Sequence, residues 1–220
     1  DYGGWDRADF AAFQNWLLKV FYPANDDFLK RHHDTNALHY WANWCLCNIA
    51  AKMAIGIVTD RRDIYNEGID HLQTGDTNGR LRRAIYHDYA PDYNFAQWQE
   101  SGRDQGHTLM CVGLMGIICQ LAWSQGDDFF AYDDNLFMRA CEYAACCNYT
   151  NETVPYTTYI WQKQSQWGYP IPEEQTALGD GKWIKRAIWA LPYYHYKGGY
   201  YDANSGGYDV LGLGTLMYAK

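Results

Sequence analysis

Basic residues are scarce in this chain. Its 220 residues include 18 lysines and arginines against 26 aspartates and glutamates, which gives a formal net charge of −8. Binding to nucleic acid releases counterions and requires a basic surface, so this composition argues against a nucleic-acid partner. Two short basic clusters, at residues 30–33 and 80–83, could steer a polyanion, although solvated helix ends are the default interpretation.

Long apolar runs and prolines are also scarce. No stretch reaches about 18 uninterrupted apolar residues, so we expect no membrane-spanning segment. Only six prolines and 48% hydrophobic residues are typical of an ordinary globular protein. The length suffices for one well-cored domain or two small ones, and neither an internal repeat nor a low-complexity tract is visible.

Cysteines and glycosylation sequons are plentiful by comparison. Seven cysteines are an odd number, so at least one thiol is free or pairs outside the chain. Asn148-Tyr149-Thr150 and Asn151-Glu152-Thr153 are two sequons in tandem, which is more than chance suggests. We therefore expect a secreted protein with glycan on Asn148 or Asn151 and with some cysteines in disulfides.

Aromatic residues make up 17% of the chain, including ten tryptophans and twenty tyrosines. Flat amphipathic rings stack on pyranose faces while their polar tips bind hydroxyls, so this content favours a sugar-binding cleft. A large helical core filled with tyrosine and tryptophan is the competing explanation.

Apolar residues recur at helical spacing along much of the sequence. Residues 84–103 and 149–181 show no such period, and no convincing strand pairs are visible, so both segments are expected to be loops. The pattern predicts an all-α domain of stacked helical hairpins. The expected helices cover residues 5–21 (ended by Pro23), 39–58, 61–72, 104–124, 134–147, 183–196 and 208–218.

The densest group of reactive side chains lies between Glu100 and His107. Eight residues hold an acid, an arginine, a second acid, an amide and a histidine, and an apolar helix follows. Glu100, Asp104 and His107 could share a helical face and bind a divalent cation. Pairing of the acids with Arg103 explains the same spacing more simply, so we expect no metal and no cofactor.

Four segments carry a family resemblance. They resemble the alginate-lyase-domain polysaccharide lyases, most closely the branch that includes glucuronan lyases, in order from about Trp5 to Tyr218. The resemblance implies an (α/α) toroid, or an incomplete one, in a single domain over residues 1–220. It also implies β-elimination on a uronic-acid polymer. The segments are Trp41-Ala42-Asn43-Trp44, Ala54-Ile55-Gly56-Ile57, the run from Gln99 to His107, and Asn204-Ser205-Gly206-Gly207-Tyr208-Asp209.

One departure from that family concerns length. Such lyases usually have a longer N-terminal portion, with more helical hairpins, than this chain contains. A shortened relative, a fragment, and a chain that completes its toroid by self-association all stay open.

Elimination from a 4-linked uronate sets three chemical requirements. The carboxylate must be neutralised, the C5 proton removed by a base, and the departing O4 protonated. The family places an asparagine at the position of Asn43 to hold the carboxylate, although a capping or interhelical role is equally open. His107 is the candidate base or carboxylate clamp, and the forked donors of Arg103 suit a uronate carboxylate.

The proton donor is expected to be a tyrosine. In glucuronate and mannuronate H5 and O4 share a ring face, so one tyrosine could serve as both base and acid in a syn elimination. Tyr159 is preferred, because its loop could fold over the cleft, and Tyr194 and Tyr196 are further candidates. The expected substrate-binding residues are Gln105, Glu100, Trp44, Trp98, Tyr156 and Tyr208.

Two other function classes remain open. A glycoside hydrolase on a helical toroid needs two carboxylates, which Glu100 with Asp104, or Asp127 with Asp128, could supply. A non-catalytic secreted glycan-binding or structural protein would fit the short length and the acidic charge. The expected partner is an anionic polysaccharide, and self-association is possible.

Overall fold

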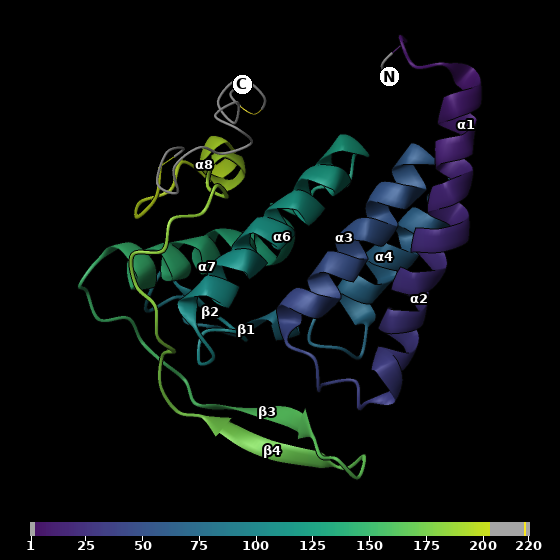
Figure 1. Cartoon of the computed structure of the whole chain (residues 1–220). Helices are drawn as coiled ribbons and strands as arrows, with labels where there is room; N and C mark the ends of the chain where they lie inside the picture. The colour runs from purple at the N-terminus through teal and green to yellow at the C-terminus, as the bar shows by residue number, and fades with distance from the viewer. Residues whose placement is uncertain (1–2, 203–217, 219–220) are drawn as a thin grey trace.

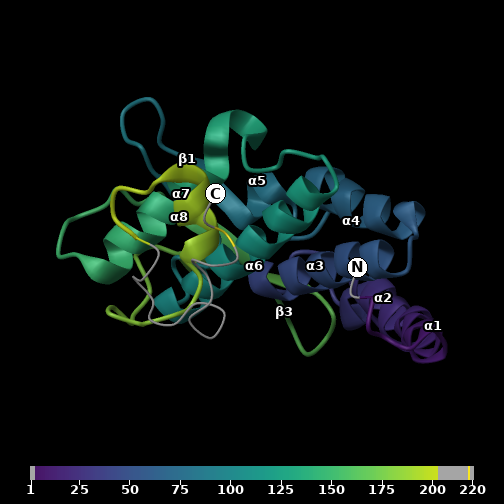
Figure 2. The ribbon, with the colours of Figure 1, turned by 90° about the horizontal axis from the view of Figure 1, so that it is seen from above.

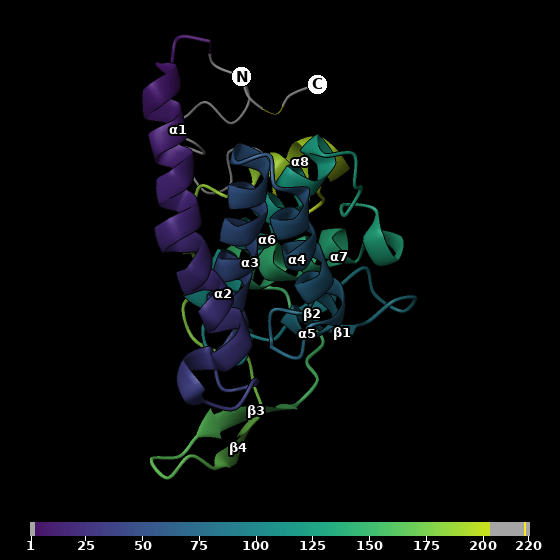
Figure 3. The same cartoon turned by 90° about the vertical axis from the view of Figure 1, so that its right-hand side faces the viewer.

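Three helices of the computed structural model lie side by side at its centre (Figure 1). The structure describes residues 3–202 and Tyr218. The central helices are α3 (Ala42–Val58), α4 (Arg62–Thr74) and α6 (Gln105–Ser124). A rod formed by α1 (Arg7–Trp16), a π-helical turn (Leu17–Phe21) and α2 (Tyr22–Arg31) covers one flank (Figure 3). The other flank carries α7 (Tyr132–Tyr149) and α8 (Ala190–Tyr196) (Figure 2).

Two small antiparallel sheets complete the described structure. Strand β1 (Ile85–Asp88) follows the short helix α5 (Leu81–Ala84) and pairs with β2 (Ala96–Trp98). Strand β3 (Tyr159–Gln164) pairs with β4 (Pro170–Gln175) in a hairpin below the starts of α3 and α6 (Figure 1).

The prediction of an all-α toroid is therefore wrong. The structure is 54% helical but also contains these four strands, and the helices of the described residues do not form a toroid, complete or incomplete. The missed strands lie within the two segments that were expected to be loops. Pro170 and Pro172 lie on β4, whose outer edge has no neighbour in its two-stranded sheet, and proline is tolerated in such edge strands.

Four predicted helices match observed ones, with shifted ends. The predictions over 39–58, 61–72, 104–124 and 134–147 correspond to α3, α4, α6 and α7. The apolar stripes of these helices meet in one core that includes Leu46, Met115 and Phe137. Periodicity was sufficient here because each helix buries a long apolar face.

Two other helix predictions need correction. Pro23 does not end the first helix but lies in the first turn of α2, directly after the π-helical turn that connects α1 and α2. Residues 183–189 are not helical, and Trp183 has a φ of 65°, so only α8 remains of the helix predicted over 183–196. The helix predicted over 208–218 lies outside the described residues except for Tyr218.

Helix α6 is apolar on most of its surface. Within the described part of the chain it is the one helix that is long and apolar enough to cross a membrane, and half of its apolar window is buried inside the molecule. Core helices of soluble proteins share this composition, so it does not by itself indicate a membrane-spanning helix. The expectation of no membrane partner stays a prediction.

The structure bears differently on the cysteines and on the two sequons. All seven cysteines are free, and only Cys47 is exposed, so the structure does not support the predicted disulfides. Asn148 is fully buried, and its side-chain amide bonds both the N–H and the carbonyl of Ile184. Asn151 is exposed after α7, which makes its sequon the accessible one. Glycosylation and secretion remain predictions.

Candidate functional site

A tight turn between β2 and α6 brings the reactive side chains together. The carbonyl of Glu100 accepts hydrogen bonds from the N–H groups of Arg103 (2.9 Å) and Asp104 (3.3 Å). Gly102 allows the close approach of a neighbouring loop, because a Cβ there would lie 2.6 Å from the hydroxyl of Tyr156. The turn therefore delivers two acids and an arginine to the start of α6.

The same turn supplies the missing caps of α3. Trp41, at the N-cap position, offers no side-chain bond to the helix. Instead Gln99 Oε1 accepts the N–H of Ala42 and Glu100 Oε1 accepts the N–H of Asn43, both at 3.0 Å. Because the first N–H groups of a helix have no internal partner, this satisfies two of them and fixes α3 against the turn.

Glu100 is a completely buried carboxyl group. Burial raises its pKa above the usual range, although the N–H of Asn43 and the charge of Arg103 act in the opposite direction. The nearest cationic atom is Nη1 of Arg103, 3.4 Å from Oε2, and Cys111 Sγ lies 3.9 Å from Oε1. Glu100 is thus held at the centre of the site with one long ion pair.

Asp104 and His107 form a carboxylate–imidazole pair at the first turn of α6. Asp104 Oδ1 accepts the backbone N–H of His107 at 2.8 Å, and Oδ2 lies 2.6 Å from His107 Nδ1. Burial would raise the pKa of Asp104, but the hydrogen bonds from His107 outweigh it and lower the pKa. An ionised Asp104 has no proton to give, so Nδ1–H donates and Nε2 is the ring atom left for other partners.

Arg103 lies between these two acids and an aromatic ring. Its Nε is 3.7 Å from Asp104 Oδ2, and its guanidinium carbon is 5.4 Å from the centre of the Trp41 ring. The side chain of Arg103 is 28% exposed and that of His107 is 32% exposed. Both can therefore meet a ligand from solvent.

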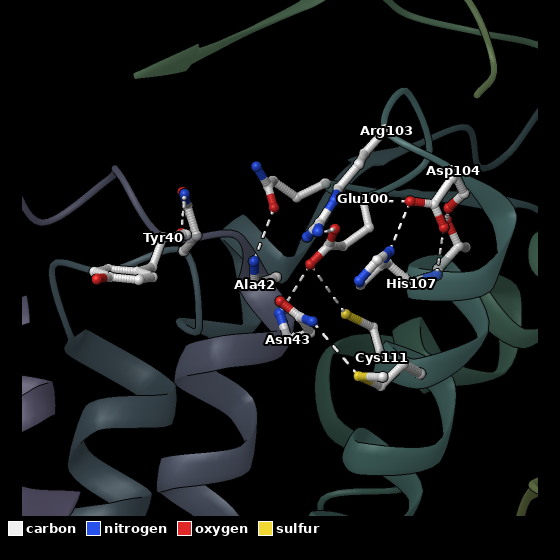
Figure 4. Close-up of polar contacts among 12 residues, drawn as sticks. Tyr40, Ala42, Asn43, Glu100, Arg103, Asp104, His107 and Cys111 are labelled. Carbon is white, nitrogen blue, oxygen red and sulfur yellow. Dashed lines mark hydrogen bonds and ion pairs between the residues drawn. The ribbon is translucent and has the colours of Figure 1, made fainter. Parts of the chain in front are cut away.

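Asn43 faces the same corner from α3 (Figure 4). Among the described residues, its Nδ2 donates only to the sulfur of Met110, at 3.5 Å, and its buried Oδ1 has no partner. Met110 lies one helical turn after His107, so this contact brings Asn43 and His107 to neighbouring turns of α3 and α6. A thioether is a weak acceptor, which leaves the amide of Asn43 available for a stronger partner.

The preferred tyrosine lies behind the turn. Tyr159 is 3% exposed, its hydroxyl donates to the carbonyl of Gln99, and the same oxygen accepts the N–H of Gly102 at 3.1 Å. Burial raises its pKa far above the usual range. Tyr156 donates to the carbonyl of Gln175 at 3.1 Å, and burial raises its pKa to about 12.

The other expected substrate-binding residues are scattered. Trp98 is fully buried and donates its indole N–H to the carbonyl of Ala140, so a polymer cannot reach it. Trp44 is 45% exposed but stacks on Phe28 of α2, beside the corner. Gln105 is buried, with its N–H bonded to the loop at Asp180. Tyr208 lies outside the described residues.

Three contributors to the corner are not evident from the sequence patterns. Gln99 caps α3, Trp41 supports Arg103, and Trp161 of β3 stacks on Trp41. The first two belong to segments that were singled out, so their position was a usable signal. Nothing in the sequence connects Trp161 with Trp41, because that contact depends on the unexpected hairpin. Among the described residues, no three His, Cys, Asp or Glu side chains are grouped so that they could hold a metal ion.

A carboxylate-bonded histidine, an arginine and a weakly bonded amide are groups that can carry out chemistry of the acid–base class on an anionic ligand. Comparison with known families agrees with that class. The sequence model of the alginate lyase family matches residues 1–153, and the chain belongs to this family. It is therefore a polysaccharide lyase in general terms. No curated protein and no solved structure matches the chain.

The family match covers most of the corner but not all of it. Asn43, Arg103 and His107 lie inside the matched residues, whereas the β3–β4 hairpin lies beyond residue 153. The glucuronan branch receives no support from the match.

Proposed function

We propose that this chain cleaves a 4-linked uronic-acid polymer, glucuronan or mannuronate-type alginate, by syn β-elimination. The observation that carries the proposal is the Asp104–His107 pair, whose free Nε2 lies in the same corner as Arg103 and Asn43 (Figure 4). Family membership supports the general class, and the corner supplies the chemistry for this substrate.

Arg103 and Asn43 neutralise the uronate carboxylate in this proposal. The guanidinium offers two parallel N–H donors to a carboxylate, and the Asn43 amide has only its weak bond to sulfur to give up. Reducing the negative charge on the carboxylate acidifies the C5 proton, because the electron pair left on C5 is delocalised into that group.

His107 then removes the C5 proton through Nε2, while Asp104 stabilises the imidazolium that forms. The C5 electron pair becomes the C4=C5 double bond, and the bond between C4 and O4 breaks. The leaving O4 takes a proton on the same ring face, either from the imidazolium or from a tyrosine. The products are a new unsaturated end and a new reducing end.

The proton-donating role of Tyr159 stays a prediction. Its hydroxyl is engaged by Gln99 and Gly102, so donation to a substrate requires that it leave these two bonds. Secretion, with glycan on the exposed Asn151, and self-association are also retained as proposals, the former because that sequon is accessible.

Product analysis with the unmodified protein tests the proposal. The protein is incubated with glucuronan, polymannuronate and polyguluronate, and ultraviolet absorbance and reducing ends are followed together. We expect both signals to rise in step with glucuronan or polymannuronate. Reducing ends without ultraviolet absorbance would show a hydrolase, and polymer binding with neither signal would show a non-catalytic glycan-binding protein.

A further inference from the structure

Trp41 connects the arginine of the site to the β3–β4 hairpin. One contact is the guanidinium of Arg103, whose carbon lies 5.4 Å from the Trp41 ring centre. The other is the ring of Trp161, stacked at 4.5 Å between centroids with 24° between the planes. Trp41 immediately precedes α3, so its backbone is fixed by the capped helix, while its ring depends on its neighbours.

Trp161 is itself fastened to the segment before α3. Its indole N–H donates to the carbonyl of His39 at 2.7 Å, and its ring stacks on the His39 ring at 6.0 Å. Three residues later on the hairpin, the N–H of Gln164 donates to His39 Nδ1 at 2.8 Å, and Gln164 Oε1 accepts the amide of Asn36 at 2.8 Å. The hairpin is therefore docked, and Trp161 has a defined orientation.

The other contacts of Arg103 are too long to fix its guanidinium. Its distances to Glu100 and Asp104 are 3.4 and 3.7 Å, beyond the usual range of a charge-assisted hydrogen bond. A guanidinium over a tryptophan ring gains both electrostatic attraction and stacking. The plane of the Trp41 ring is thus the surface that restricts where the Arg103 fork points.

We propose that Trp161 is a positioning residue: it holds the Trp41 ring so that Arg103 is oriented toward the substrate carboxylate. The inference rests on the proposed function for what Arg103 binds. The hairpin that carries Trp161 lies beyond the residues matched by the family. Trp161 acts through Trp41 and Arg103 and touches neither the proton nor the leaving oxygen.

Orientation matters because a planar carboxylate is bound by two parallel N–H groups only when the fork lies in its plane. Loss of the stack leaves Arg103 charged and present but free to rotate. The expected result is weaker use of the substrate carboxylate, with the Asp104–His107 pair unchanged.

The first test is the Arg103 side chain itself, observed by NMR in the full chain. The ring current of Trp41 shifts the Arg103 side-chain protons upfield, and in W161A we expect them to move toward their unstacked positions. W161F keeps an aromatic face without the bond to His39 and should give an intermediate shift. W167A is the matched control, since Trp167 lies on the same hairpin and is 76% exposed; its shift should equal that of the unmodified chain. An unchanged Arg103 signal in W161A and W161F would overturn the proposal.

The second test is a kinetic cycle with R103A. We expect W161A alone to lower kcat/KM by roughly tenfold, within the range of a cation–π contact, and W161F to recover part of the loss. In an R103A background W161A should cost less than about twofold, because both changes remove the same interaction. Additive losses would overturn the proposal. If the unmodified chain has no lyase activity, the proposed function fails, and the NMR shifts still decide whether Trp161 positions Arg103.

Discussion

Two buried charge clusters of this molecule are built differently. In the first, between α2, α3 and α4, the ammonium of Lys52 bonds Asp26 at 2.8 Å and Glu67 at 2.6 Å. The hydroxyl of Tyr22 donates to the same Glu67. In the second, at the start of α3 and α6, a fully buried Glu100 has one ion pair at 3.4 Å.

The difference distinguishes a cluster that stabilises the fold from a corner that can bind a ligand. The Lys52 cluster gives its central charge two short partners, as a structural ion pair requires. The Glu100 corner keeps an amide with a sulfur partner, an arginine with long contacts and a histidine with one ring nitrogen to spare. Because this corner is partly exposed, a ligand can supply the hydrogen-bond and ion-pair partners that these polar groups lack.

Loss of Lys52 should have the largest effect on stability. K52M leaves Glu67 without its cation and Asp26 with the exposed Lys30 alone, and we expect a loss of about 3 kcal/mol, at the low end for a buried pair because Glu67 is 41% exposed. Urea unfolding measures it. The control is K30M, which removes a 69% exposed partner of the same Asp26 and should cost less than about 1 kcal/mol. Equal losses in the two variants would show that the buried Lys52 stabilises the fold no more than the exposed Lys30 does.

Asn43 should matter for turnover. N43A removes the amide that faces the substrate carboxylate, and we expect kcat/KM to fall roughly 100-fold, or about 2.7 kcal/mol of transition-state stabilisation. Asn48 is the matched control, since it also lies on α3 but is only half-buried and bonds locally, to Trp44 and Cys47. N48A should retain nearly full activity. A fully active N43A would remove Asn43 from the mechanism.

A half-buried histidine beside the Lys52 cluster should make stability depend on pH. Burial lowers the pKa of His71 to about 4, below the unfolded value of about 6.5. Between those values the unfolded chain binds the extra proton, so stability falls as pH drops through this window. Over this pH window we expect H71N to lose about 2 kcal/mol less unfolding free energy than the unmodified chain. This value allows for partial exposure of the His71 ring. Identical pH slopes for the two proteins would contradict the assignment.

Tyr159 should have the smallest effect on stability, and its effect on turnover tests its role. Y159F removes the hydroxyl bonded to Gln99 and Gly102, at a cost of about 1 kcal/mol in unfolding free energy. If the hydroxyl transfers the proton, kcat also falls roughly 100-fold. A decrease below about tenfold would instead show that Tyr159 supports the turn.

How far the sequence predicts the fold depends on the kind of contact. Helices α3 and α6 follow from local periodicity, because each buries a long apolar face. Strand β2 has three fully buried residues and therefore no alternation to detect. In β3–β4 the turn residue Gly168, with a φ of 83°, was a usable signal, but Pro170 and Pro172 obscured it.

For the site residues, too, local patterns were predictable from the sequence and long-range contacts were not. Arg103 and His107 were predicted from their own segment and Asn43 from the family resemblance, and contacts through Met110 and Glu100 bring them together. Gln99 as the cap of α3 and Trp161 as the partner of Trp41 depend on contacts between residues that are far apart in sequence. Such contacts are set by tertiary packing, which periodicity does not report.

The rate at which H107N forms unsaturated ends from polymannuronate or glucuronan, relative to the unmodified chain, tests the central claim most directly. The asparagine keeps a polar side chain beside Asp104 but has no basic nitrogen. We predict that ultraviolet absorbance rises roughly 100-fold or more slowly, with urea unfolding changed by less than about 1 kcal/mol. An H107N protein that forms unsaturated ends at the unmodified rate would contradict the account, because the Asp104–His107 pair would then have no part in proton transfer.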